Sequence, residues 1–156
     1  MARLRSATDR TERQIDEIGR LARPLDGVAD LDPLLERIGE ARIVQIGEAS
    51  HGTSEYYRWR AELTKRLIEE RGFSFVAVEG DWPDCAVVDG WLRDHGDSRP
   101  APAVLAAFER WPTWMWANED VARFLSWAKE LGQGRPPAER MAFHGLHVYS
   151  LWDSLR

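Results

Sequence analysis

The chain reads GFSFVAVEGDWP from Gly72 to Pro83, and this stretch decides how it folds. The apolar, partly β-branched run at Phe73–Val78 is typical of a strand that is covered on both faces. Asp81 follows as a natural N-cap, with proline in the first turn of the helix that it would begin. The stretch therefore predicts a strand that leads directly into a helix.

Two further segments have the character of buried strands, Ile43–Ile46 and Met141–Leu146. Between the first of them and the strand at 73–78, helical periodicity runs from Thr53 to about Arg71 and stops at Gly72. A strand, a helix and a strand in this order predict a right-handed parallel crossover. The expected fold class is α/β, a mostly parallel sheet with helices on both faces.

The remaining periodic segments predict helices around this sheet. They are Thr11–Leu21, a short helix opening at Leu31–Leu35 with Asp32 as its N-cap, and residues 82–94, 104–108 and 116–131. A length of 156 residues with 44% hydrophobic content suits one domain with a real core. We expect an N-terminal helical segment over residues 1–30 and the α/β domain over residues 31–156.

Composition excludes several classes of protein. The 21 Lys and Arg residues against 26 Asp and Glu residues give a net charge of -5 without a basic block, which disfavours a nucleic-acid partner. The single cysteine, Cys85, cannot form an internal disulfide. No stretch approaches the roughly 18 consecutive apolar residues that a membrane-spanning helix needs, and no signal-type segment begins the chain. We expect a soluble, cytoplasmic protein.

Polar residues gather where the predicted strands end. Glu48 and His51 follow the first strand, and Glu79 closes the second. His147 follows the third strand. Because ligands of open parallel sheets bind beyond the carboxyl ends of the strands, we expect these four side chains to face one crevice. For Glu79 the alternative is a glutamate at a strand end that caps the following helix or is simply solvated.

His51 lies just before the predicted helix and three residues after Glu48. A neutral imidazole can accept a proton while Glu48 accepts a hydrogen bond from its other ring nitrogen, which fixes the tautomer that a general base needs. The alternative is a histidine that bonds locally in a turn. The pattern indicates a candidate general base with its orienting carboxylate.

Arg60 lies in the middle of the apolar stripe of its helix. At about 100° per residue, Tyr57 and Leu67 fall within roughly 60° of it. A guanidinium group stays protonated, so a buried one needs carboxylate partners, and we expect Arg60 to pair with Glu48, Glu79 or both. The alternative is a side chain that reaches solvent past the aromatic rings.

Other features have weaker implications. Glu48-x-x-His51 has the spacing of a di-iron ligand pair, but it lies in a loop and has no second copy, so we expect neither metal nor cofactor. Cys85 has no base partner in the sequence and is expected to be a buried structural thiol. Eight tryptophans, three of them within Arg110–Trp116, are expected to anchor packing, with an aromatic substrate wall as the alternative.

Four motifs in order resemble the erythromycin esterase family, which includes proteins called succinoglycan biosynthesis proteins. They are GEASHGT (47–53) with Arg60, VAVEGDWP (76–83), PTWMW (112–116) and GLHVYSL (145–151). The resemblance implies an α/β hydrolytic fold and metal-independent hydrolysis of an ester, or of a macrolide lactone in the members that confer resistance. It also implies that His51 activates water and that Glu48, Arg60 and Glu79 surround it.

The resemblance implies a mechanism and an incomplete domain. His51 would take a proton from the attacking water, Glu48 would steady the imidazolium, and Arg60 would hold the carboxylates or oppose the oxyanion. Family members usually carry aspartate at the position of His147. They are well over twice this length and draw further active-site residues from a later part of the chain, so this chain resembles an N-terminal fragment. The alternatives are a non-catalytic small-molecule binding module and a metal-dependent hydrolase with Glu48, His51 and Glu79 as ligands.

Overall fold

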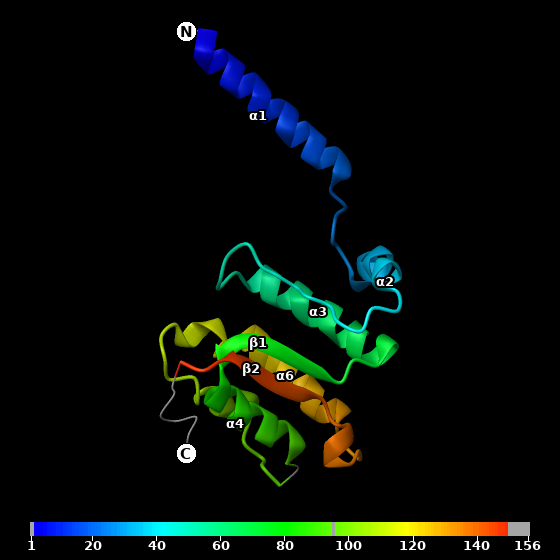
Figure 1. Cartoon of the computed structure of the whole chain (residues 1–156), viewed down its shortest axis with the longest axis vertical. Coiled ribbons are helices and arrows are strands. Elements are labelled where there is room, and N and C mark those ends of the chain that lie inside the picture. The colour runs from blue at the N-terminus through cyan, green and yellow to red at the C-terminus, as the bar shows by residue number, and fades with distance from the viewer. Residues whose placement is uncertain (1, 95, 150–156) are drawn as a thin grey trace. The chain divides into compact units, whose positions relative to one another are not determined.

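A computed structural model describes residues 2–94 and 96–149 (Figure 1). The chain folds as two compact units, Met1–Gly39 and Glu40–Arg156. The first unit contains α1 (Ala2–Leu21), a 3-10 turn at Val28–Leu31 and α2 (Asp32–Ile38). The helix predicted over Thr11–Leu21 is part of α1. Leu31 is the N-cap of α2, so the prediction of Asp32 as the cap was wrong by one residue, while Pro33 lies in the first turn as expected.

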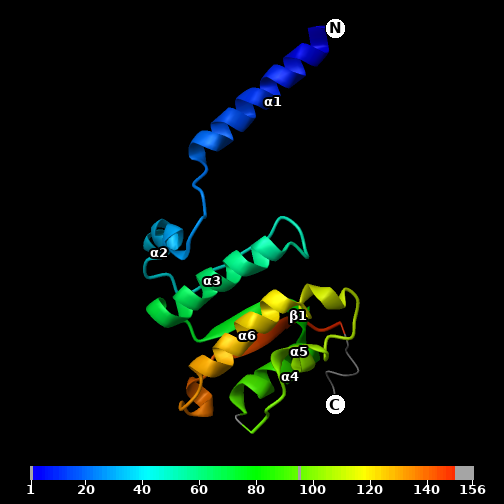
Figure 2. The same ribbon diagram turned by 180° about the vertical axis from the view of Figure 1, so that it is seen from behind.

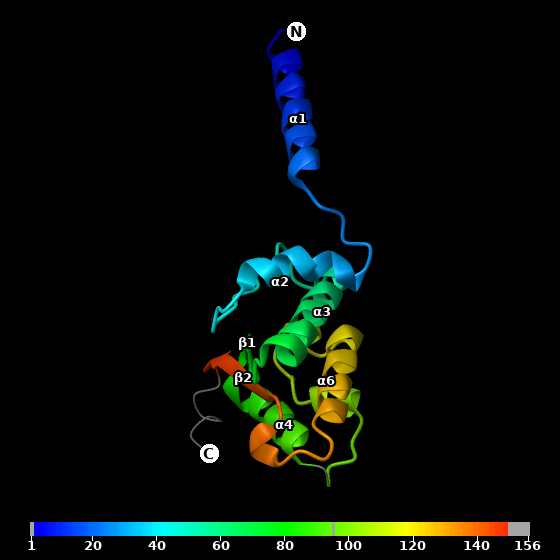
Figure 3. The same ribbon diagram turned by 90° about the vertical axis from the view of Figure 1, so that its right-hand side faces the viewer.

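The second unit carries the α/β architecture. Its elements are α3 (Ser54–Arg71), β1 (Phe75–Asp81), α4 (Trp82–Arg93), α5 (Ala101–Leu105), α6 (Glu119–Leu131) and β2 (Ala142–His147), with 3-10 turns at Thr113–Met115 and Pro137–Glu139. Helix α6 lies behind the two strands in Figure 1 and in front of them in Figure 2. Viewed from the side in Figure 3, α3 and α6 lie on the same side of the strands.

The sheet of the described residues consists of β1 and β2, which pair in parallel. Phe75 lies opposite Ala142, and the register continues in step as far as Val78, which pairs with Gly145. An irregularity follows before Asp81 pairs with His147. The crossover between the two parallel strands therefore consists of α4, α5 and α6, and α4 packs along β2.

The prediction of a strand at Ile43–Ile46 is wrong. This segment has no strand pairing, and Ile43 is 79% exposed. A strand exists only where its backbone pairs with a neighbour, and within the described residues the sheet consists of β1 and β2 alone. The predicted crossover from this segment through α3 to β1 is therefore absent, although α3 and β1 themselves form where they were expected.

The local signals for helix ends explain the other boundaries. Gly72 ends α3 with a φ of 72°, the left-handed conformation that glycine tolerates best. The Asp81 carboxylate accepts a hydrogen bond from the Trp82 amide at 3.1 Å, which confirms it as the N-cap of α4. Helix α6 begins three residues later than predicted because the Asn118 side chain caps it by accepting from the Val121 amide at 3.0 Å. Helix α5 lies at 101–105 rather than 104–108.

The core of the second unit lies between β1, β2 and helices α4 to α6. Its fully buried members are Cys85, Val88, Leu92, Val104, Leu105 and Leu125. Burial raises the pKa of the Cys85 thiol to about 12, which confirms the predicted structural thiol and keeps it protonated. No helix in the described ranges is both long enough and apolar enough to cross a bilayer.

Gly145 lies on β2 where the backbone of β1 approaches very closely. A Cβ there would meet the backbone oxygens of Gly80 and Asp81 at 2.7 and 2.8 Å. Since backbone atoms cannot rotate away, we expect Gly145→Ala to lower the free energy of unfolding by about 1–3 kcal/mol in urea denaturation. Gly90→Ala on α4, where an added methyl meets nothing within 4 Å, is the matched control and should raise stability by up to about 1 kcal/mol. Equal stabilities for the two variants would contradict this account.

Candidate active site

A cavity of about 670 Å³ lies beside the edge of β1 in the second unit. It is bounded by residues 42–48, by α3 and by β1, with further contacts from the segment before α6. Most of its wall is apolar and includes Ile46, Leu67, Phe75 and Phe124. The polar part of the wall contains four of the five residues expected there from the sequence, Glu48, His51, Arg60 and Glu79.

His51 and Glu48 form a direct pair in this cavity. The distance between His51 Nδ1 and Glu48 Oε1 is 2.5 Å. The Glu48 side chain is only 11% exposed, whereas the imidazole is 47% exposed. An ionised carboxylate can only accept a hydrogen bond, so Nδ1 carries the hydrogen and donates the hydrogen bond to Oε1. In the neutral imidazole, Nε2 is then the nitrogen that can accept a proton. The geometry suits an imidazole that is oriented on one side and free to accept a proton on the other.

Arg60 pairs with the second oxygen of the same carboxylate. Its Nη2 lies 3.2 Å from Glu48 Oε2, and its side chain is 21% exposed. Glu48 Oε2 is buried and accepts no hydrogen bond within the described part of the chain, so the guanidinium charge compensates it electrostatically. The predicted pairing of Arg60 with Glu48 is therefore present. Between Arg60 and Glu79, both within the described ranges, there is no ion pair.

Glu79 reaches the cavity from β1, and its own side chain is exposed. Its backbone carbonyl accepts a hydrogen bond from Trp116 Nε1 at 2.9 Å. That bond ties the end of β1 to the tryptophan-rich segment. Glu79 therefore shares the cavity with Glu48 and His51 without joining their direct pairing.

His147 does not join the cavity, so the expectation that it faces the same crevice is wrong. Its ring packs edge-on against Tyr149, with the ring centroids 4.6 Å apart. Leu146 lines the cavity in its place.

The tryptophan-rich segment supports the site, a role that its composition alone did not reveal. The Trp114 ring packs so closely on Gly52, which has a φ of 79°, that a Cβ there would lie 2.9 Å from it. The Tyr57 hydroxyl donates to the Met115 carbonyl at 2.7 Å, and Trp116 packs against the core. Trp116 meets the expectation of a packing anchor, whereas Trp111 is exposed and Trp114, although it contacts Gly52, is 44% exposed.

The alternative of a metal site lacks a ligand set in this geometry. Among residues 2–94 and 96–149, no three His, Cys, Asp or Glu side chains gather closely enough to hold a metal ion. Asp120 also lines the cavity, but Ser54 Oγ donates to its Oδ2 at 2.6 Å and Arg123 Nη1 donates to its Oδ1 at 3.0 Å. This carboxylate therefore docks the first turn of α6 against the first turn of α3.

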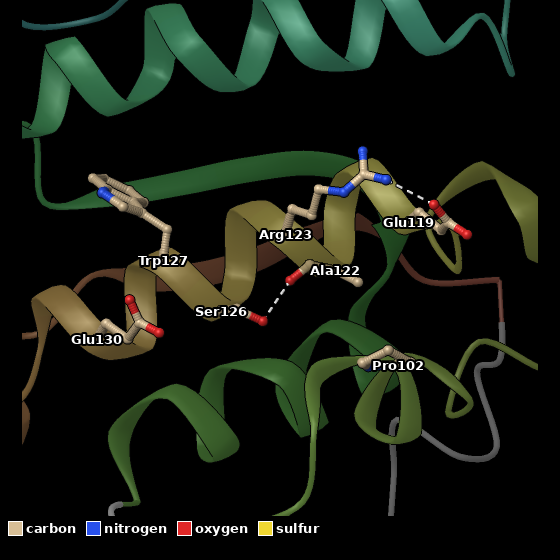
Figure 4. Close-up of a pocket in the computed structure, with 7 residues that line it drawn as sticks. All are labelled: Pro102, Glu119, Ala122, Arg123, Ser126, Trp127 and Glu130. Carbon is tan, nitrogen blue, oxygen red and sulfur yellow. Dashed lines mark hydrogen bonds and ion pairs between the residues drawn. The ribbon is translucent and has the colours of Figure 1, made fainter.

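A second hollow, of about 530 Å³, follows one stripe of α6 beside Pro102 (Figure 4). Arg123 reaches back along the helix to Glu119 at 2.7 Å, and the Ser126 hydroxyl donates to the Ala122 carbonyl at 2.8 Å. These polar groups satisfy one another on the helix surface. The hollow contains no counterpart to the imidazole and carboxylate pair of the first cavity.

The ion pair between Arg60 and Glu48 should stabilise the chain measurably. We expect Arg60→Ala to lower the free energy of unfolding by about 1–3 kcal/mol, because it leaves the mostly buried Glu48 carboxylate without its opposing charge. Arg58→Ala is the matched control, since Arg58 is exposed on the same helix, and it should change stability by less than about 0.5 kcal/mol. Chemical denaturation compares the two, and an Arg60→Ala variant as stable as the parent would show that the pair contributes nothing.

Known proteins are similar to this chain in sequence, and solved structures are similar to it in fold. The chain is 30% identical over 129 residues to erythromycin esterase type II of Escherichia coli, covering 83% of this chain and 29% of that protein. It is 38% identical over 141 residues to YbfO of Bacillus subtilis strain 168, which is named provisionally as a hydrolase, covering 88% of this chain and 29% of that protein. The chain therefore spans less than a third of the length of these relatives.

Two solved structures have the same fold over most of the chain. A succinoglycan biosynthesis protein superposes with a TM-score of 0.62 at 26% identity, over 80% of this chain and 29% of its own. A Bacillus cereus protein superposes with a TM-score of 0.60 at 24% identity, over 79% of this chain and 28% of its own, which shows the fold alone. The family model described as erythromycin esterase matches residues 68–156, more than half of the chain. The chain belongs to the erythromycin esterase family.

Proposed function

We propose that this cavity takes part in the hydrolysis of a carboxylic ester, with His51 as the general base that activates water. The observation that carries the proposal is the 2.5 Å contact between His51 Nδ1 and Glu48 Oε1. An imidazole whose tautomer is held by a carboxylate is the arrangement that general-base catalysis requires. The names of the Escherichia coli and Bacillus subtilis relatives, an esterase and a hydrolase, support the same class of reaction.

The proposed reaction begins when Nε2 of His51 takes a proton from water. The water oxygen attacks the ester carbonyl carbon, and Glu48 stabilises the imidazolium that forms. The tetrahedral intermediate then expels the alkoxide, which takes the proton back from His51. Arg60 holds the far oxygen of Glu48 at 3.2 Å, so that the near oxygen stays opposite the imidazole. No cofactor is needed for these steps.

The cavity wall supports a bulky, largely apolar ester as the substrate. Apolar side chains such as Ile46 and Phe75 form most of a space of about 670 Å³, a size that suits a small molecule. Because one relative is named an erythromycin esterase, a macrolide lactone is the first substrate to test. This chain spans 29% of the length of that relative. The proposal therefore includes the same activity in a longer protein that contains this chain.

Substitution of His51 tests the proposal directly. We expect His51→Ala to reduce ester hydrolysis by about 10²- to 10⁴-fold, the contribution of a general base. His144→Ala is the matched control, because His144 is exposed on β2 and contacts Phe75 rather than Glu48. Hydrolysis of a p-nitrophenyl ester and of erythromycin by the 156-residue chain gives the rates. An unchanged rate of hydrolysis in His51→Ala would show that His51 is not the general base.

Chemical modification separates this mechanism from one that uses the cysteine. With its pKa raised to about 12 by burial, the Cys85 thiol is protonated at pH 8 and should resist iodoacetamide in the folded chain. Unfolding in urea should make it react, which mass spectrometry would detect. Labelling of Cys85 in the folded chain, without urea, that abolishes hydrolysis in proportion would contradict a water nucleophile.

The apolar wall also favours a second function, the binding of a small apolar molecule without turnover. In that case the parent chain and His51→Ala would bind a macrolide with equal affinity in calorimetry, and neither would release hydrolysis products. The esterase proposal instead expects products from the parent alone.

A further inference from the structure

Tyr57 lies beneath the pair of Arg60 and Glu48 and is fixed at both of its ends. It belongs to α3, one turn before Arg60, and is only 6% exposed. Its hydroxyl donates to the Met115 carbonyl at 2.7 Å, and its ring meets the Trp116 ring edge-on with centroids 6.5 Å apart. A tyrosine held by a hydrogen bond at its tip and by packing along its ring has little freedom to move.

The Arg60 guanidinium rests on this ring. Its Cζ lies 4.7 Å from the Tyr57 ring centroid, within the range of a cation–π contact. Its Nη2 lies 3.2 Å from Glu48 Oε2. An arginine side chain has several rotatable bonds, so the ring and the carboxylate together define where the guanidinium stays.

The contacts form one continuous path from the tryptophan-rich segment to the imidazole. Met115 holds the Tyr57 hydroxyl, the Tyr57 ring carries Arg60, and Arg60 faces Glu48. Glu48 Oε1 then accepts from His51 Nδ1. Each contact joins residues that are adjacent in space, and the first of them links positions 58 residues apart in the sequence.

We propose that Tyr57 is a positioning residue of this site, because its ring fixes the Arg60 guanidinium that holds Glu48 opposite His51. The catalytic half of this inference rests on the proposed ester hydrolysis. The structural half, that the Tyr57 ring places Arg60, stands apart from any reaction. The two halves therefore need separate measurements.

Three substitutions at position 57 separate the ring from simple core packing. Tyr57→Leu keeps apolar volume and removes the ring, and Tyr57→Phe keeps the ring and removes the hydroxyl. Pentafluorophenylalanine in place of Tyr57 keeps the ring shape but reverses the charge distribution that attracts a cation. Tyr56→Leu is the matched control, since Tyr56 is exposed on the same helix and does not line the cavity.

Nuclear magnetic resonance of the Arg60 Nε–H group measures the structural half. In the parent and in Tyr57→Phe we expect a signal shifted by the ring current and an ordered side chain. Tyr57→Leu should lose that shift, the pentafluorinated ring should leave Arg60 mobile, and Tyr56→Leu should match the parent. Arg60 signals that stay unchanged in the leucine and pentafluorinated variants would overturn the proposal. If Tyr57→Leu fails to fold, the pentafluorinated variant decides alone.

Ester-hydrolysis kinetics measure the catalytic half. We expect Tyr57→Leu to lower kcat by about 10- to 100-fold with little change in KM, because a displaced Glu48 misplaces the base rather than the substrate. Tyr57→Phe should recover most of kcat. A chain that hydrolyses no ester would refute the proposed function. The Arg60 resonances would still show whether the Tyr57 ring positions the guanidinium. Normal kcat in a variant whose Arg60 is mobile would overturn the positioning role.

Discussion

The Glu48 carboxylate is the group on which the site depends. One of its oxygens faces the His51 imidazole at 2.5 Å, and the other faces the Arg60 guanidinium at 3.2 Å. A carboxylate that is mostly removed from water is tolerated only when opposite charge or hydrogen-bond donors compensate it. Arg60 provides that charge, and it also leaves the first oxygen free to orient the imidazole. The stability of the site and the proposed chemistry therefore depend on the same carboxylate.

This arrangement is held from a distance by the tryptophan-rich segment before α6. Trp114 packs on Gly52 beside the histidine, Met115 accepts the Tyr57 hydroxyl, and Trp116 donates to the backbone of Glu79. The segment thus contacts the loop that carries His51, the helix α3 that carries Arg60 and the strand β1 that carries Glu79. The loop between Ile46 and Thr53 packs against an aromatic ring that comes from a distant part of the sequence, Trp114.

The sequence predicted most of the elements because their signals are local. The apolar run at 73–78, the glycine after α3 and the N-cap at Asp81 each act within a few residues, and each prediction agrees with the structure to within a few residues. The strand at Ile43–Ile46 failed because apolar composition predicts burial but does not name a pairing partner. The prediction for His147 failed because its position after a strand does not specify which neighbour its ring packs against, and that neighbour is Tyr149.

The sequence by itself determined the α/β class, the family motifs and the candidate group of Glu48, His51, Arg60 and Glu79, because spacing along a helix or after a strand limits which side chains can meet. Only the tertiary structure decided that Arg60 forms its ion pair with Glu48 and that the Arg60 guanidinium lies on the Tyr57 ring. It alone showed that Trp114, Met115 and Trp116, which lie within the crossover between α5 and α6, contact the site. These contacts join segments tens of residues apart, so their distances depend on how whole elements pack, which no local pattern of residues records.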